Sequence, residues 1–209
     1  MLIYLHGLNS SGQSYKGGVL RERLAPTAVL SPSYPAHRPD TAVAVLTGVF
    51  RELIGKRPPL VVGSSMGGFY GQYLARQFAF AHLFLINPAL TPWDLLREYE
   101  GMTQTTARGK TYRIDRAMIE STRKYEVADP CDGVPTTLFM DRGDEVIDYR
   151  IAESLYRRCG RLLIFDGGDH SFQHLETAIA VIQEEVARCE HRVPQSQKPP
   201  SAEGEGQRQ

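Results

Sequence analysis

The chain has 209 residues, of which 42% are hydrophobic and 23% are charged, with 24 basic and 24 acidic residues. This length predicts one domain or at most two, with a core large enough to fold without disulfides or metals. The balanced charge excludes the basic composition of a nucleic-acid binder, so we expect no nucleic-acid partner. No apolar run reaches the roughly 20 residues of a membrane-spanning helix, so we expect no membrane partner.

The N-terminal segment and the cysteines bear on the cellular compartment. The chain begins Met-Leu-Ile-Tyr and has neither the basic nor the long apolar region of a signal peptide. We therefore expect a cytoplasmic protein. Cys131, Cys159 and Cys189 are odd in number, widely spaced and free of any Cys-x-x-Cys pair, which predicts reduced thiols and neither a disulfide nor a zinc site.

Taken in chain order, short apolar runs alternate with amphipathic stretches. The runs, bounded by Gly, Pro, Asp or Asn, are typical of buried parallel strands and cover residues 2–5, 27–30, 60–62, 83–86, 136–140 and 162–165. The helix-like stretches lie near residues 15–24, 40–54, 66–78, 149–159 and 172–188. This alternation predicts a mostly parallel, doubly wound α/β sheet of about six strands in a single domain over residues 1–190.

Two segments fall outside this rhythm. Residues 87–135 are too long for a simple helical crossover, and we expect a small helical cap at about 88–130 that contributes to substrate binding. The alternative is a peripheral helix pair without substrate contact. Residues 191–209 are almost free of apolar side chains, which predicts a disordered C-terminal tail.

The chemistry-bearing motif is Gly-Ser-Ser-Met-Gly at residues 63–67, directly after an apolar run and at the start of a helical stretch. This context is typical of a nucleophile elbow, in which the central serine, here Ser65, is exposed on a sharp strand-to-helix turn. A serine hydroxyl needs a neighbouring base and backbone N–H donors to react. The neighbouring Ser64 is expected to support the turn.

Two later loops carry a candidate acid and a candidate base. Asp144 lies in Gly-Asp-Glu-Val after the fifth apolar run, and His170 lies in Gly-Gly-Asp-His after the sixth. Serine, acid and histidine then follow in the chain order of α/β-hydrolases. The predicted triad is Ser65 as nucleophile, His170 as general base and Asp144 as the carboxylate that orients the imidazole.

Other residues could fill the two supporting roles. The acid could instead be Asp141 or Asp148, and Asp166 or Asp169 could orient the histidine loop locally. The competing histidines are His6, His37, His82, His174 and His191. His82 is expected in the core or at a strand edge, and His191 at the surface.

An oxyanion hole needs two backbone donors, one from the residue after the nucleophile and one from the loop after an early strand. These are Met66 and Leu8, the latter following His6-Gly7. His6 itself is equally consistent with a structural histidine that is hydrogen-bonded in the core. The glycines after Ser65 let the helix pack close to the sheet, and its N-terminus would stabilise negative charge.

The chain resembles the YqiA/YcfP-like esterases over residues 2 to about 186. The similarity rests on Tyr-Leu-His-Gly-Leu-Asn-Ser-Ser at 4–11, Gly-Ser-Ser-Met-Gly-Gly at 63–68, Asn-Pro-Ala at 87–89, Gly-Asp-Glu-Val-Ile-Asp-Tyr-Arg at 143–150 and Gly-Asp-His at 168–170. The resemblance implies a compact α/β-hydrolase fold with esterase activity on short acyl esters and acyl-CoA thioesters. Met66 departs from the expected leucine, but its role rests on the backbone N–H.

The expected cap is rich in positive charge between residues 108 and 124. The six basic residues are Arg108, Lys110, Arg113, Arg116, Arg123 and Lys124. They predict either attraction of an anionic substrate group, such as the phosphates of an acyl-CoA, or a solvated helix face.

No motif for a cofactor or metal is present. The glycines at 63–68 match neither a Walker loop nor a dinucleotide fingerprint, and there is no His-Glu-x-x-His helix for zinc. We expect no cofactor and no metal, and a small acyl ester or thioester as substrate. A peptidase or amidase on the same triad, and a non-catalytic binding protein that has kept the fold, remain alternatives.

Overall fold

The structure is a computed structural model, and it describes residues 1–131 and 133–191. Six strands form one sheet in the order β2-β1-β3-β4-β7-β8, and every neighbouring pair is parallel. The strands are β1 (Leu2–Leu5), β2 (Val29–Leu30), β3 (Leu60–Ser64), β4 (His82–Ile86), β7 (Thr136–Asp141) and β8 (Arg161–Phe165). The predicted parallel α/β sheet of six strands is confirmed.

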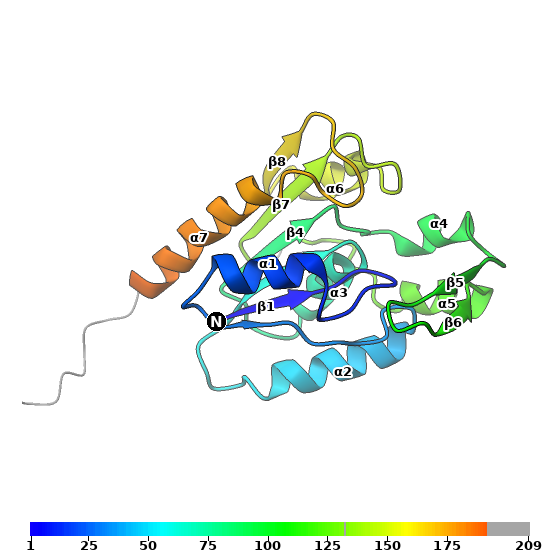
Figure 1. The fold of residues 1–209 in the computed structure, drawn as a ribbon, viewed down its shortest axis with the longest axis horizontal. Coiled ribbons are helices and arrows are strands. Elements are labelled where there is room, and N and C mark those ends of the chain that lie inside the picture. Colours follow the sequence, from blue (N-terminus) through cyan, green and yellow to red (C-terminus); the bar gives the residue numbers. More distant parts are fainter. Residues whose placement is uncertain (132, 192–209) are drawn as a thin grey trace, which may run out of the picture.

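Helices cover both faces of this sheet (Figure 1). One face packs against α1 (Tyr15–Arg23) and α7 (Leu175–His191); the other packs against α2 (Pro39–Arg51), α3 (Met66–Leu74) and α6 (Tyr149–Tyr156). Successive side chains of a strand point to opposite faces, so a strand covered on both sides is apolar throughout. In β1, Leu2 and Tyr4 join one apolar cluster and Ile3 and Leu5 the other.

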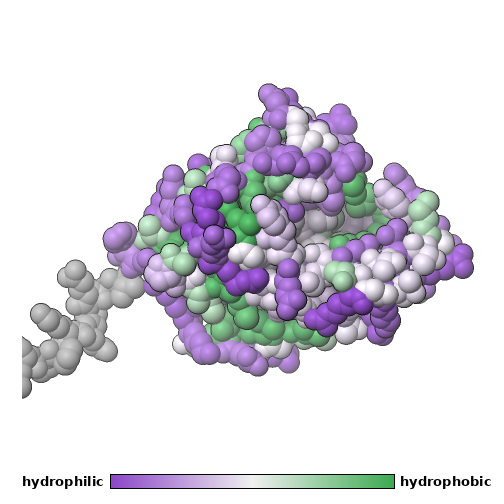
Figure 2. Space-filling view, in the orientation of Figure 1, coloured by the Kyte–Doolittle hydropathy of each residue, from purple (hydrophilic) through white to green (hydrophobic). Residues whose placement is uncertain are grey.

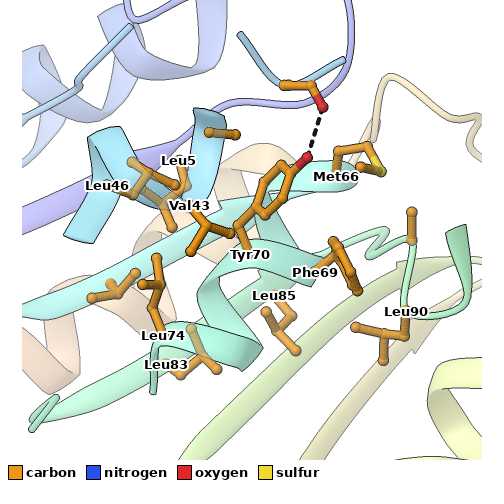
Figure 3. Packing of buried hydrophobic residues seen from close by; sticks show 14 of the residues in the cluster. Leu5, Val43, Leu46, Met66, Phe69, Tyr70, Leu74, Leu83, Leu85 and Leu90 are labelled. Atoms are coloured by element: carbon orange, nitrogen blue, oxygen red, sulfur yellow. Dashed lines mark hydrogen bonds between the residues drawn. The ribbon is translucent and has the colours of Figure 1, made fainter. Parts of the chain in front are cut away.

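A buried tyrosine hydroxyl lies where α2 and α3 pack together on the sheet. The hydroxyl of Tyr70 donates a hydrogen bond of 2.7 Å to the carbonyl of Ala36, in the segment that enters α2 (Figure 3). Leu5, Val43 and Leu74 belong to the same apolar cluster, and Leu5 and Leu74 are fully buried. Because an unpaired buried hydroxyl is costly, this hydrogen bond fixes the loop before α2 relative to α3.

The insertion after β4 is only partly helical, which corrects the expected helical cap. It consists of α4 (Pro92–Arg97), an antiparallel hairpin of β5 (Thr103–Thr105) and β6 (Thr111–Arg113), and α5 (Arg116–Arg123). In Figure 1 these four elements lie together at the right-hand end of the molecule. The hairpin strands have three residues each and are mostly exposed and polar, so they lack the apolar periodicity that predicts a strand. We call α4, β5, β6 and α5 the cap.

Several predicted boundaries were too generous. β2 has two residues, α3 ends at Leu74, and α7 begins at Leu175 after a loop in which Gly167, Gly168 and Phe172 all have positive φ. Positive φ is incompatible with a continuous helix, and this explains the later start of α7. Of the predicted tail at 191–209, His191 is the last residue of α7, and residues 192–209 lie outside the described residues.

The expectation of three reduced cysteines was wrong, since Cys131 and Cys159 form a disulfide. Cys131 precedes β7 and Cys159 precedes β8. These two strands are parallel neighbours, so the segments that enter them lie at the same end of the sheet. Their 28-residue separation in sequence conceals this proximity. Cys189 is a half-buried free cysteine in α7.

None of the helices within the described residues combines the length and the apolar character that crossing a membrane requires.

Candidate active site

The predicted site residues lie at one edge of the sheet. The carboxyl ends of parallel strands meet at the same edge, where ligands bind in open α/β sheets. Leu8 follows β1, Ser65 follows β3, Asp144 follows β7 and His170 follows β8. Four loops that are far apart in sequence therefore meet around one space.

Ser65 occupies a strained turn between β3 and α3. Its φ of +52° and ψ of −121° lie outside the regions that non-glycine residues favour. Such strain persists only where the surrounding structure over-determines it. Here the backbone N–H of Ser65 donates at 3.0 Å to Ile86 O, and its carbonyl accepts at 3.1 Å from the N–H of Ala89. Both contacts lock the turn onto the end of β4.

The glycines that flank Ser65 are required by close packing. A Cβ on Gly63 would lie 2.5 Å from the carbonyl oxygen of Gly67, and a Cβ on Gly67 would overlap the carbonyl oxygen of Leu5. Both approaches are closer than real Cβ atoms allow. The turn can therefore press against β1 only because side chains are absent at positions 63 and 67.

Asp144 and His170 form a close pair. The Nδ1 atom of His170 lies 3.0 Å and 3.1 Å from the two carboxyl oxygens of Asp144. The Asp144 side chain is 2% exposed, and that of His170 is 27% exposed. Because an ionised carboxylate only accepts hydrogen bonds, Nδ1 carries the hydrogen and Nε2 of the neutral ring is left as the acceptor. This arrangement suits a general base.

Backbone groups hold both members of the pair. The N–H groups of Val146 and Ile147 each donate at 2.9 Å to Oδ1 of Asp144. The N–H of His170 donates at 3.0 Å to the carboxylate of Glu145. The pair is therefore fixed in orientation by the loop that follows β7.

The other aspartates considered for the catalytic acid contact residues other than His170. Asp141 contacts His174, Asp148 contacts Arg150, Asp166 contacts Arg142 and Asp169 contacts Gln173. Among the described residues, Asp144 is thus the one aspartate that pairs with the His170 ring.

The rival histidines also have other surroundings. His6 is 1% exposed, accepts the N–H of Tyr34 at Nε2 (3.3 Å) and stacks on that ring. Burial lowers the pKa of His6, and a contact with the carbonyl of Gly7 partly offsets this. His6 is therefore a structural, neutral histidine. His37 stacks on Tyr112, His82 contacts Thr137, His174 contacts Asp141, and the exposed His191 ends α7.

Ser65 and His170 line one cavity of about 620 Å³, together with both predicted oxyanion residues, Leu8 and Met66. Met66 is the first residue of α3, so its N–H has no acceptor within the helix. The N–H of Leu8 has no acceptor among the described residues. Two backbone donors are thus available on the serine side of the cavity.

The cavity wall differs from side to side. The cap contributes an apolar wall made of Leu95, Leu96, Tyr99 and Ile114. The space-filling view shows the molecule hollowed between the cap and the rest of the domain, with apolar residues inside the hollow (Figure 2). The cap therefore lines the cavity, and its contact with a substrate stays a prediction.

The cavity lining also contains polar residues, among them Lys16 near the start of α1. Burial lowers the pKa of the Lys16 ammonium, and the charges of Asp169, Asp141 and Asp144 partly offset this effect. Lys16 was not predicted from the sequence, because a lone lysine after a serine-rich loop carries no pattern.

Two buried polar residues support the histidine loop through contacts that the sequence did not predict. Asp141 is fully buried; its carboxylate accepts the N–H of Gln173 at 2.8 Å and contacts Nδ1 of His174 at 2.6 Å. Asn87 links the end of β7 to the carbonyl of Asp169. The Asn-Pro-Ala segment at 87–89 was the available signal, but it did not identify this contact.

Among the described residues, no group of three or more His, Cys, Asp or Glu side chains could hold a metal ion.

The sheet order, the elbow and the loop positions define an α/β-hydrolase fold. Residues 1–185 match the uncharacterised protein family UPF0227, also called the YqiA/YcfP family. The chain belongs to this family. The resemblance noted from the sequence is thereby confirmed.

Solved structures share the fold at low sequence identity. Est1E from Butyrivibrio proteoclasticus superimposes with a TM-score of 0.74 and 16% identity over 91% of this chain and 88% of that one. Mouse alpha/beta hydrolase domain-containing protein 10 gives 0.72 and 15% over 90% and 89%. Paleococcus ferrophilus monoacylglycerol lipase gives 0.69 and 15% over 90% and 94%. At these identities the likeness establishes the fold.

Proposed function

We propose that this protein is a serine esterase or thioesterase that hydrolyses small acyl esters through an acyl-enzyme. The observation that supports this most strongly is the Asp144–His170 pair, whose ring lines the same cavity as a serine on a strained elbow. Strain, a fixed base and free N–H donors in one cavity are the parts that acyl transfer needs.

In the first half of the reaction, Ser65 Oγ attacks the acyl carbon while Nε2 of His170 takes the serine proton. The carbonyl oxygen becomes negative and accepts hydrogen bonds from the N–H groups of Leu8 and Met66. His170 then gives the proton to the leaving alcohol or thiol as its bond to the acyl carbon breaks, leaving the acyl group on Ser65.

In the second half, His170 takes a proton from water, and the hydroxide attacks the acyl-enzyme. The collapse of this second tetrahedral intermediate releases the carboxylic acid and returns the proton to Ser65. Asp144 stays ionised throughout and stabilises the imidazolium that forms in each half. No cofactor takes part.

The cavity indicates where the substrate's acyl group binds. The apolar wall of Leu95, Leu96, Tyr99 and Ile114 favours a hydrocarbon chain through burial from water. The similar folds include an esterase and a monoacylglycerol lipase, which is consistent with acyl ester chemistry. We expect the reaction to take place in the cytoplasm, on small molecules.

Initial rates on three substrates with one acyl group test the proposal: an aryl ester, an acyl-CoA and a peptide amide. We expect hydrolysis of the ester or thioester, and a loss of at least about 10³-fold in Ser65→Ala. A dominant amide rate would identify a peptidase instead. Equal rates in wild type and Ser65→Ala would identify a non-catalytic binding protein.

A further inference from the structure

A second cavity, of about 250 Å³, lies next to the catalytic cavity. Asn9 and Ser10 line both cavities, so a single loop segment separates them. Three cations line the second cavity: Arg38 before α2, and Arg108 and Lys110 in the turn between β5 and β6. We call this second cavity the basic groove.

The cations of the basic groove form no ion pair among the described residues, and Arg38 and Lys110 also line a neighbouring cavity that includes Asp40 and Asp115. No acidic residue lines the groove, and among the described residues no carboxylate lies within ion-pair distance of Arg38, Arg108 or Lys110. Other basic residues of the cap differ in this respect. Arg123 pairs with Asp94 and Glu120, and Lys124 pairs with Asp40.

Of the six basic residues in the predicted cap, only some line the basic groove. Arg113 donates through Nε to the carbonyl of Gly101, and the exposed Arg116 lies outside the basic groove. Arg108 and Lys110 remain, joined by Arg38 from a distant part of the chain. Three exposed cations from two segments, without an ion pair among the described residues, give this surface a positive charge that favours an anion.

Hydroxyl groups in the same groove can add hydrogen bonds. Ser33 Oγ accepts the N–H of Gly12 at 3.0 Å, and Thr106 Oγ1 accepts the N–H of Lys110 at 3.1 Å. Each hydroxyl keeps its own hydrogen for another acceptor. Phosphate oxygens accept such bonds well, alongside arginine and lysine.

The loop segment between the two cavities is tied to the cap. Asn9 follows Leu8, and both polar atoms of its side chain bond to the cap hairpin: Nδ2 donates to Gln104 at 3.1 Å, and Oδ1 accepts from Tyr112 at 2.8 Å. The cap hairpin thus stays beside the loop after β1 (Figure 1). With the acyl chain along the apolar wall, we expect the leaving group to extend past Asn9, which lines both cavities.

We propose that the basic groove binds the phosphate groups of the leaving group, and that the substrate is an acyl ester or thioester of a phosphate-bearing alcohol or thiol. This inference rests on the proposed esterase function. Positive charge also acts on the neighbouring side chains. The pKa of His37 is lowered by burial first and then by Lys110 and Arg38.

Kinetics with one acyl group on three leaving groups test the proposal. The substrates are the acyl-CoA, the acylglycerol phosphate and the neutral monoacylglycerol. Arg108→Glu/Lys110→Glu is compared with Lys56→Glu/Arg116→Glu, which makes the same charge change at exposed positions outside both cavities. We expect KM for a phosphate-bearing substrate to rise at least about tenfold in the groove variant alone, with the neutral substrate unchanged.

A second variant distinguishes a loss of charge from a distortion of the β5–β6 hairpin. Arg38→Glu lies on a different segment and should give the same selective rise in KM. Equal effects on the neutral substrate, equal effects in the control pair, or no effect at all would each overturn the proposal. The phosphate-bearing substrate that responds identifies the source of the phosphate.

A binding measurement separates this proposal from the esterase function. Titration of wild type and Ser65→Ala with coenzyme A and with glycerol 3-phosphate should show binding of one of them, weakened at least about tenfold in the groove variant. Binding without hydrolysis of any ester would contradict the esterase function and support phosphate binding by the basic groove. Hydrolysis without binding of either compound, and with equal KM in all variants, would support the esterase function and contradict phosphate binding by the basic groove.

Discussion

The side-chain oxygen of Asn87 accepts a hydrogen bond of 2.9 Å from the backbone N–H of Asp141, and the Asn87 amide nitrogen donates at 2.9 Å to the carbonyl of Asp169. Asn87 is 3% exposed and directly follows β4. It therefore joins the ends of β4 and β7 to the loop that carries His170. We therefore expect Asn87 to be a positioning residue for the proposed triad.

Asn87→Ala should lower kcat by about 10–10²-fold and leave KM within about threefold, because small displacements of a catalytic base are costly. The substitution also leaves two backbone groups without a partner, so stability should fall by about 1–3 kcal/mol for each. Steady-state kinetics and urea unfolding measure the two effects.

Ile182→Ala, in α7, is the matched control, since it costs about 2–5 kcal/mol of stability without touching the cavity. An equal loss of kcat in that variant would show general loosening of the fold. Unchanged kcat in Asn87→Ala would remove its positioning role.

Asp144→Asn should fold normally and lose about 10²–10⁴-fold in kcat. The amide oxygen of the asparagine can still accept hydrogen bonds from the N–H groups of Val146 and Ile147. Its NH₂ group then faces Nδ1 of His170 and favours the tautomer with the hydrogen on Nε2, which cannot act as the base. Asp148→Asn serves as the control, because Asp148 caps α6 and binds Arg150. Full activity in Asp144→Asn would move the acid to another residue.

Stability should decrease as the pH falls below about 6.5, partly because of His6. Burial lowers its folded pKa, so between the folded and unfolded values the unfolded chain binds more protons. That difference contributes at most about 1.4 kcal/mol per pH unit for one proton. Protonation at Nε2 would also break the bond from Tyr34 N–H.

The free energy of unfolding, measured from pH 5 to 8, checks this effect. His6→Gln should flatten the slope below pH 6.5, and His191→Gln, at an exposed position, should leave it unchanged. A steeper slope in His6→Gln, or the same slope as wild type, would contradict a neutral buried His6.

The disulfide between Cys131 and Cys159 should stabilise the fold without affecting catalysis. Closing a loop of 28 residues constrains the unfolded chain, by about 3–4 kcal/mol in the chain-entropy estimate. Neither cysteine lines the catalytic cavity. Cys131→Ser/Cys159→Ser should therefore unfold at lower urea and keep wild-type kcat. Identical unfolding of wild type with and without dithiothreitol would mean that the bond is absent.

The central strands could be predicted from sequence because they are buried on both faces. Residues 60–62 and 83–86 form continuous apolar runs, and the structure extends each of them by one or two polar or small residues. The loops after β3, β7 and β8 carry Ser65, Asp144 and His170 at one edge of the sheet, where the structure brings Asp144 and His170 into contact. The roles of these residues remain a prediction.

Features that depend on contacts distant in sequence could not be predicted. The three-residue strands β5 and β6 consist of threonines, a glutamine, a tyrosine and an arginine without an apolar face. The disulfide depends on the pairing of β7 with β8. Arg38 joins the basic groove only because the segment before α2 lies beside the cap hairpin. No local pattern marks such residues.

Labelling with a fluorophosphonate followed by peptide mapping tests the central claim most directly, because the reagent modifies only a serine that a neighbouring base activates. The account predicts a single adduct on Ser65 in the wild type, strongly slowed in His170→Ala and absent in Ser65→Ala. An unlabelled wild-type protein, or an adduct on Ser64 or any other serine, would contradict it.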